Sequence, residues 1–198
     1  MVMPFFLFWG IINMKGKSKK QAKDRKIIDW KWIITISILS FIISFLFSMF
    51  GEIVIPRVHL VFAILILLLF IFLGIIFDIL GIAVTVADIG VFNSMAAKKV
   101  RGSALAVKLI KNSNKVASFF NDVIGDICGI VSGSTGVAIA LILNGEFHFN
   151  LLYTTLIITA SISMLTIGGK AMGKSYAINK CNDILHRFVK ILSIVYKG

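Results

Sequence analysis

The chain has 198 residues, of which 58% are hydrophobic and only 15% are charged, and its mean hydropathy is +0.96. Soluble domains are about 45–50% apolar and about 25% charged, so this composition excludes an ordinary soluble protein and indicates a membrane protein. The formal net charge of +12 would suggest nucleic acid in a soluble chain. Here the basic residues lie between apolar runs, so the positive-inside rule explains them better, and we expect no nucleic-acid partner.

The sequence carries no motif of a known catalytic or nucleotide-binding site. Its two cysteines, Cys128 and Cys181, lie far apart and predict neither a disulfide framework nor a zinc site. The three histidines are scattered, and no catalytic triad or phosphate-binding loop is visible. We therefore expect a protein that is not an enzyme and that has no covalent cofactor.

The first 31 residues divide into two parts. Residues 1–13 are apolar but too short for a spanning helix, which needs about 20 residues, so an interfacial anchor is favoured. Residues 14–31 contain eight Lys and Arg, and we expect this segment to face anionic lipid head groups on the cytoplasmic side. The remainder, residues 32–198, is expected to form a single transmembrane domain.

Two apolar runs follow, at residues 32–50 and 58–87, and each predicts a spanning helix. The second has one polar face, whose members recur at steps of three and four residues. Because a carboxylate among aliphatic residues costs several kcal/mol at mid-membrane, Asp78 is a candidate ion-binding residue. The alternative is a structural carboxylate that bonds a neighbouring helix. The polar face consists of Gly74, Asp78, Gly81, Thr85 and Asp88.

Residues 88–118 carry six Lys and Arg and predict a basic helical hairpin. The segments MAAKKV and ALAVKLIKN are expected to form two short amphipathic helices hinged at Gly102. Residues 112–114 are expected to interrupt the helix before the next span.

The third predicted span, residues 119–143, opens with FFNDVIGDICGIVSGSTG. Its glycines fall at four-residue steps, beginning at Gly125, and predict a smooth stripe where another helix can approach closely. Asp122 and Asp126 lie along the same stripe, which makes both carboxylates candidates for ion binding or coupling. The glycines expected to pack helices together are Gly74, Gly81, Gly129 and Gly133.

The fourth predicted span covers residues 151–169, and an amphipathic juxtamembrane helix is expected over residues 171–196. That last helix would lie on the membrane surface or on a partner helix. The polar stripe of the span consists of Thr155, Thr159, Ser163, Thr166 and Lys170. The apolar face of the juxtamembrane helix consists of Ala177, Cys181, Ile184, Phe188, Ile191 and Val195.

The distribution of basic residues predicts the orientation. Segments 14–31, 88–118 and 170–198 hold 8, 6 and 6 of the 21 Lys and Arg, and the remaining one is Arg57. By the positive-inside rule, four spans then place both termini in the cytoplasm. We expect the membrane to be the inner membrane of a bacterium.

Three of the predicted spans bring polar groups to a similar depth. At 1.5 Å per residue, Asp78 lies roughly 14 Å from the inner end of its span and Asp126 about 12 Å from the inner end of the next, with Ser163 on the fourth span near the same level. Carboxylate, hydroxyl and backbone oxygens suit a hard cation such as Mg²⁺, Ca²⁺ or Na⁺, so Asp78 and Asp126 are the expected metal ligands. The alternative is a Lys170–carboxylate pair, or a shared proton, that only holds the bundle together.

Residues 60–195 resemble the transmembrane domain of the cyclin M and CorC/CorB magnesium transporters. The segment MAAKKVRGSALAVKLIKNSNKVASFFNDVIGDICGIVSG is similar to that family's helical hairpin and the Gly-Asn segment that follows, with Gly125 and Asp126 at the Gly-Asn position. The segment GGKAMGKSYAINKCNDILHRFVKIL resembles the start of its juxtamembrane helix, with Lys174 at a family lysine. The resemblance implies a homodimer in which side-chain and backbone oxygens of three helices hold Mg²⁺, with Na⁺-coupled export as the proposed activity.

The chain also departs from the family pattern. Residues from Gly81 to Thr85 stand where the family has Ser-Gly-Ser-Glu, Lys170 replaces a glutamate and Gly173 replaces a proline. The expected function is a cation transporter or exchanger whose ion-binding or coupling residues include Asp78, Asp122, Asp126, Gly125, Thr85 and Ser163. The alternative is a membrane scaffold or partner subunit that acts through its basic cytoplasmic segments.

Overall fold

The structure, a computed structural model, describes residues 30–54, 58–148 and 150–195, and these ranges contain helices and no strand. The predicted segments at residues 1–13 and 14–29 lie outside the described residues. The helices are α2 (Trp30–Val54), α3 (Leu60–Val86), α4 (Ile89–Ala97), α5 (Ser103–Lys111), α6 (Ser113–Ser118), the π-helical segment η2 (Phe119–Gly125), α7 (Asp126–Phe147), α8 (Leu151–Asn179) and α9 (Cys181–Val195).

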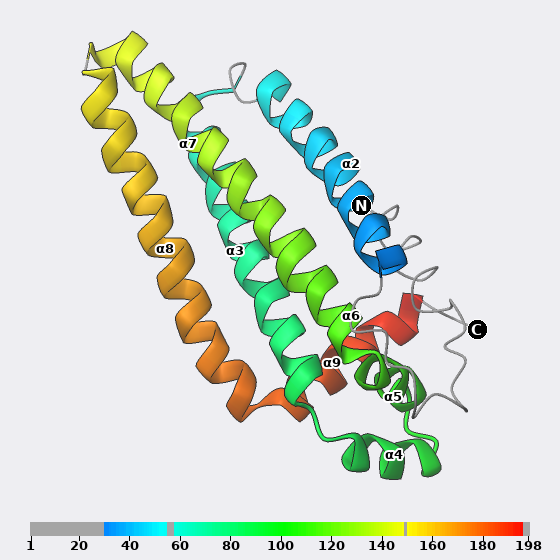
Figure 1. Cartoon of the computed structure of the whole chain (residues 1–198). Helices are drawn as coiled ribbons and strands as arrows, with labels where there is room; N and C mark the ends of the chain where they lie inside the picture. The colour runs from blue at the N-terminus through cyan, green and yellow to red at the C-terminus, as the bar shows by residue number, and fades with distance from the viewer. Residues whose placement is uncertain (1–29, 55–57, 149, 196–198) are drawn as a thin grey trace.

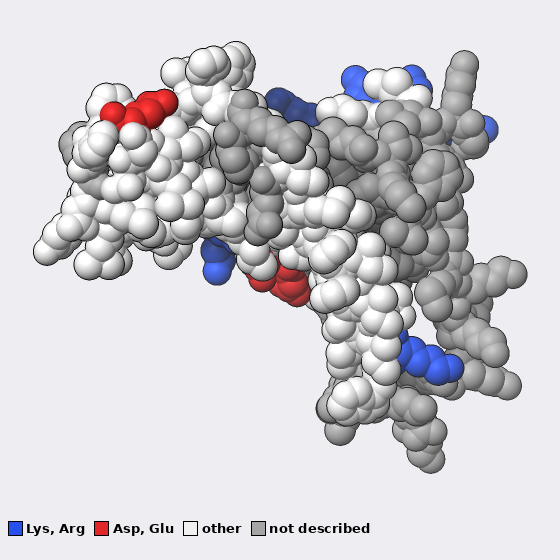
Figure 2. Space-filling model, turned by 90° about the horizontal axis from the view of Figure 1, so that it is seen from above, with Lys and Arg blue, Asp and Glu red and all other residues white. Residues whose placement is uncertain are grey.

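Four stretches of helix in the described part are long and apolar enough to cross a membrane: α2, α3, α8, and the run Ser113–Phe147 formed by α6, η2 and α7. This confirms the predicted all-helical fold with four apolar helices. Large hydrophobic side chains cover their outer faces, as they do on proteins surrounded by lipid. Figure 2 shows that charged side chains are few on the described surface seen from above, since blue and red occur there only in small groups.

Two helix boundaries differ from the predicted spans. The third helix begins at Ser113 and not at residue 119, and the fourth continues to Asn179 and not to 169. A span ends where charge begins, whereas a helix ends only where its backbone hydrogen bonds end. Gly169 and Gly173 lie within α8 and do not end it. The absence of a side chain at each of them leaves room for Ile75 and Ile79 of α3.

Helix α3 lies at the centre of the bundle. It packs against both α7 and α8, which also contact each other, whereas α2 packs chiefly on α7. The four long helices alternate in direction, so the start of α2, the helices α4 to α6 and α9 all lie at one end of the molecule (Figure 1). The Lys and Arg that the structure describes lie at the start of α2, in the turn between α4 and α5, in α5 and α6, in the last third of α8 and at its C-cap, and in α9. They gather toward this end, which we call the basic end.

The glycines pack α3 against α7 at one crossing. A Cβ added to Gly74 would lie 3.2 Å from the Cβ of Cys128 and 3.6 Å from the carbonyl oxygen of Gly125. The predicted stripe does not continue beyond this point, because no described atom lies within 4 Å of a Cβ added to Gly129 or Gly133. The physical reason is that a four-residue step exceeds one helical turn by about 40°, so the stripe rotates away from α3.

Two apolar cores hold the helices together. The larger lies toward the basic end, where α9 places Leu185 and Val189, both fully buried, against α3 and the α4–α5 hairpin. The smaller lies toward the opposite end and joins α3, α7 and α8 through residues such as Ile71, Ile139 and Ile162. The bundle is therefore fastened above and below the level of Asp78.

The apolar face predicted for the juxtamembrane helix is partly wrong. Ile184 and Phe188 do pack against the larger core, but Ile191 is 63% exposed, and Leu185 and Val189 are the buried residues instead. The physical reason is that the helix is interrupted at Lys180, so α9 starts with its own rotation and does not continue the face of α8.

The hairpin between α4 and α5 turns at Lys98–Gly102. Helix α4 starts at Ile89, where Asp88 caps it by accepting a hydrogen bond from the Gly90 backbone N–H. The segment MAAKKV, predicted as a helix of its own, therefore forms only the last turn of α4 and the start of the turn that follows. Gly102 has φ +84°, and a Cβ there would lie 2.9 Å from the carbonyl oxygen of Val189. This position requires glycine both for its backbone conformation and for the approach of α9.

We expect Gly102→Ala to lower the free energy of unfolding by about 1–3 kcal/mol, because alanine disfavours positive φ and its methyl group meets α9. Titration with a denaturing detergent, followed by circular dichroism, measures this change. Gly145→Ala is the matched control, since a Cβ at Gly145 meets nothing within 4 Å. Equal unfolding midpoints for the two variants would contradict the packing described for α9.

Candidate functional site

The third long helix changes its hydrogen-bonding pattern next to the centre of the bundle. Residues Phe119–Gly125 form a π-helical segment between α6 and α7, and they contact α3. A π-helical segment shifts the register of side chains and leaves backbone carbonyls less regularly paired, and such segments occur frequently at functional sites. No periodic pattern in the sequence predicted it.

Asn121 of η2 faces α3 at Gly81. A Cβ added to Gly81 would overlap the Asn121 side-chain amide, so the missing side chain of this glycine makes room for Asn121. The Asn121 Oδ1 atom is buried and has no hydrogen-bond partner among the described residues. An unpartnered buried carbonyl oxygen is costly in a protein interior, unless a ligand or water satisfies it. Sequence reasoning missed Asn121, although it had named Gly81 as a packing residue.

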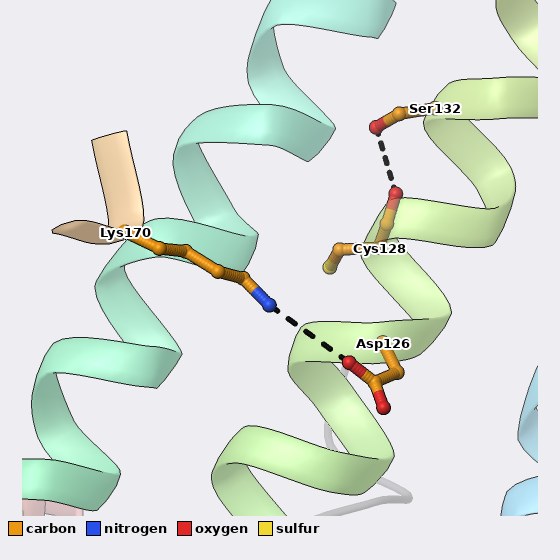
Figure 3. Close-up of polar contacts among 4 residues, drawn as sticks. All are labelled: Asp126, Cys128, Ser132 and Lys170. Atoms are coloured by element: carbon orange, nitrogen blue, oxygen red, sulfur yellow. Dashed lines mark hydrogen bonds and ion pairs between the residues drawn. The ribbon is translucent and has the colours of Figure 1, made fainter. Parts of the chain in front are cut away.

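Lys170 of α8 and Asp126 of α7 form an ion pair across the bundle. The Lys170 Nζ atom lies 3.8 Å from Asp126 Oδ1, and Figure 3 shows the lysine side chain reaching from α8 toward α7. The Nζ atom also lies 3.7 Å from the position of a Cβ at Gly125, so a larger residue there would crowd the ammonium group. The Lys170 side chain is 26% exposed and that of Asp126 is 68% exposed.

Asp78 of α3 is half-buried beside this ion pair. Its carboxylate is partly removed from solvent by burial and lies within reach of the charges of Lys170, Asp126, Lys174 and Asp122. The three acids predicted as ligands therefore share one electrostatic neighbourhood with two lysines.

Three other predicted site residues are exposed. Thr85 is exposed and donates its hydroxyl to the Ile82 carbonyl oxygen at 2.7 Å, and Asp122 and Ser163 are also exposed. Thr166 takes the place expected for Ser163, since it lies one turn from Lys170 and its buried Oγ1 has no hydrogen-bond partner among the described residues. Helical spacing alone could not choose between these hydroxyls, because the tilt of α8 against α3 decides which one faces inward.

We define the polar seam as Asp78, Asn121, Asp126, Thr166 and Lys170. Its acceptors are carboxylate, amide and hydroxyl oxygens, which suit hard cations. No group of three His, Cys, Asp or Glu that could hold a metal occurs in ranges 30–54, 58–148 and 150–195. A cation in the seam would therefore need Asn121, Thr166, backbone oxygens or water in addition to carboxylates. The nearby Ser132 hydroxyl instead donates to the Cys128 carbonyl oxygen at 2.7 Å (Figure 3).

We expect Gly81→Ala to destabilise the bundle by about 1–3 kcal/mol, because the new methyl group forces Asn121 and the π-helical segment to move. Thermal unfolding of the purified protein measures the change. Gly168→Ala is the control, since it adds the same methyl group where nothing lies within 4 Å, and it should leave stability unchanged or raise it slightly. A stable Gly81→Ala protein would show that Asn121 is not held against α3.

Comparison of the chain with protein-family models, with curated proteins and with solved structures found no match.

Proposed function

We propose that this protein is a cation transporter or exchanger that binds a divalent cation of the Mg²⁺ class in the polar seam. The observation that carries the proposal is the half-buried carboxylate of Asp78, which shares its surroundings with the Asp126–Lys170 ion pair and the π-helical segment. Ionised groups within spanning segments are costly and commonly mark ion pathways. The unpartnered oxygen of Asn121, which lies against Gly81 one turn along α3 from Asp78, adds a neutral ligand from the neighbouring helix.

Lys170 acts in this proposal as a tethered counter-ion. Its Nζ–Oδ1 distance of 3.8 Å exceeds the 2.7–2.9 Å of a tight charge-assisted hydrogen bond, so an incoming cation can displace the ammonium group from Asp126. The lysine stem is long and flexible, which lets the charge withdraw without a movement of the helix. The metal ion and the Lys170 ammonium group would then occupy the seam in turn.

The choice of Mg²⁺ over Ca²⁺ or Na⁺ rests on the oxygen-only chemistry of the seam and on the resemblance to the cyclin M and CorC/CorB transporters. The same resemblance proposes a homodimer, with Gly129 and Gly133 available to a second copy because a Cβ added to either one would meet nothing within 4 Å in the described chain. By the positive-inside rule, the basic end would lie in the cytoplasm and the protein in the inner membrane.

We expect Asp78→Asn and Asp126→Asn each to weaken Mg²⁺ binding at least about tenfold, because each removes a negative charge from the seam. Isothermal titration of the purified protein with Mg²⁺, Ca²⁺ and Na⁺ measures the affinities. Asp183→Asn is the control, since it removes an exposed carboxylate from α9 and should bind as the unmodified chain does. If the unmodified chain binds none of the three ions, the proposal is overturned.

We expect Lys170→Met to bind the cation more tightly, by about tenfold, because the tethered competitor is gone and the carboxylates remain. Titration together with thermal unfolding separates two roles of the lysine. If Lys170 only holds the bundle together, the variant loses stability and gains no affinity. Lys180→Met is the control for loss of a positive charge at the basic end, since Lys180 lies at the end of α8 outside the seam.

The second candidate is a membrane scaffold or partner subunit. The ion pair between Lys170 and Asp126 favours it, because the charges partly compensate each other without any ligand. Segment 14–31, of which residues 14–29 lie outside the described part, and helix α9 would then carry the function. In that case deletion of 14–31 abolishes function, whereas Asp78→Asn and Asp126→Asn are tolerated.

A further inference from the structure

A second feature of the molecule, separate from the polar seam, is an apolar cavity of about 490 Å³. It lies between α2, α3, the η2–α7 helix and α9, and the described residues that line it are almost all apolar. Ile43 and Phe47 contribute from α2, Leu73 from α3, and Phe188 from α9. The described lining carries no charged, amide or hydroxyl side chain, and its one weakly polar side chain is the Cys128 thiol, so an apolar occupant fits it better than water.

The size and shape of the cavity fit a hydrocarbon chain. A cavity of about 150 Å³ lined by Leu, Ile and Phe already binds benzene, and this one is about three times larger. The lining residues of α3 run from Leu69 to Phe77, eight positions that correspond to about 12 Å along the helix. An elongated apolar cavity of this kind is suited to an acyl chain.

The cavity exists because α2 stands apart from α3. Helix α2 packs chiefly on α7, and the edge-on contact of Phe47 with Phe70, whose ring centroids lie 5.8 Å apart, bridges α2 to α3 beside the cavity. The outer faces of both helices carry exposed large apolar residues, including Phe41, Phe45 and Phe72. In a membrane this surface faces lipid chains, which are therefore the apolar molecules available to enter.

Positive charge lies at the basic end of the same cavity. Lys115 is one helical turn before Phe119, which lines the cavity, and its Nζ atom lies 4.8 Å from the centroid of the Trp32 ring. Arg101 donates a hydrogen bond to the carbonyl oxygen of Ser193, the neighbour of the lining residue Leu192. Basic groups beside an apolar chain-sized cavity complement a lipid with an anionic head group.

We infer that this cavity binds one acyl chain of an anionic phospholipid from the leaflet at the basic end, with the head group near Lys115 and Arg101. The lipid would fill the space between α2 and the remaining helices and would tie α2 to the bundle. This site does not depend on the cation proposal, because the two share no charged residue.

The test uses the full chain with the photoreactive residue benzoylphenylalanine at Phe47, in bilayers containing equal amounts of phosphatidylglycerol and phosphatidylethanolamine. Mass spectrometry then identifies the cross-linked molecule. Phe45→benzoylphenylalanine is the matched control, because Phe45 lies on the same helix, is 60% exposed and does not line the cavity. We expect adducts at Phe47 to be enriched at least about threefold in phosphatidylglycerol over those at Phe45.

Two results would overturn the inference: an equal lipid ratio at the two positions, or adducts at Phe47 to the apolar residues 1–13 of the chain itself. A second variant tests the cavity directly. Leu73→Trp fills it and should reduce the lipid adduct at Phe47 severalfold, whereas Leu68→Trp adds the same ring on the exposed face of α3 and should not. Unchanged adduct yield in a folded Leu73→Trp protein would place the lipid elsewhere.

Discussion

The close crossing of α3 and α7 at Gly74 is the contact on which the rest of the structure depends. Without a Cβ at Gly74, the two backbones approach until Cys128 and the Gly125 carbonyl lie against α3. Helices in a membrane associate through such contacts between small residues, since lipid chains are as apolar as the helix surfaces. The crossing brings Asp78, one turn further along α3, beside the part of the third helix that carries Asp126 and the π-helical segment.

The polar seam follows from this crossing and from the apolar surroundings. An acid at this depth needs a partner, because the hydrocarbon region offers no water to solvate it. The described chain supplies Lys170 for Asp126, but it leaves the Asn121 and Thr166 oxygens without hydrogen bonds. A purely structural seam would be expected to satisfy these groups internally. The unpartnered oxygens of Asn121 and Thr166 therefore support the proposed binding site over an ion pair that only holds helices together.

The basic end joins the two proposed sites to the membrane surface. Helix α9 and the α4–α5 hairpin are fastened to α3 by a common apolar core that includes Leu109, Leu185 and Val189. The same helix α9 contributes Phe188 to the apolar cavity. A lipid chain in the cavity and a cation in the seam would thus both contact the helix formed by η2 and α7.

The sequence by itself determined the helical class, the four apolar helices and the concentration of positive charge between them. These are properties of composition and of runs of residues, and burial in hydrocarbon leaves a backbone few alternatives to the helix. It also identified Asp78 and Asp126 as acids that would come close together, because period and depth can be counted along a chain. In the structure Asp78 is half-buried on α3, whereas the Asp126 side chain is 68% exposed and pairs with Lys170.

Only the tertiary structure decided which polar groups meet. The π-helical segment turns Asn121 toward Gly81, Lys170 reaches Asp126 across the bundle, and Gly129 and Gly133 remain uncovered. Each of these depends on the tilt and rotation of one helix against another, which periodicity along a single helix does not contain. A four-residue pattern predicts a shared face over one or two turns, but rotation of the face and packing against neighbours determine where that face points.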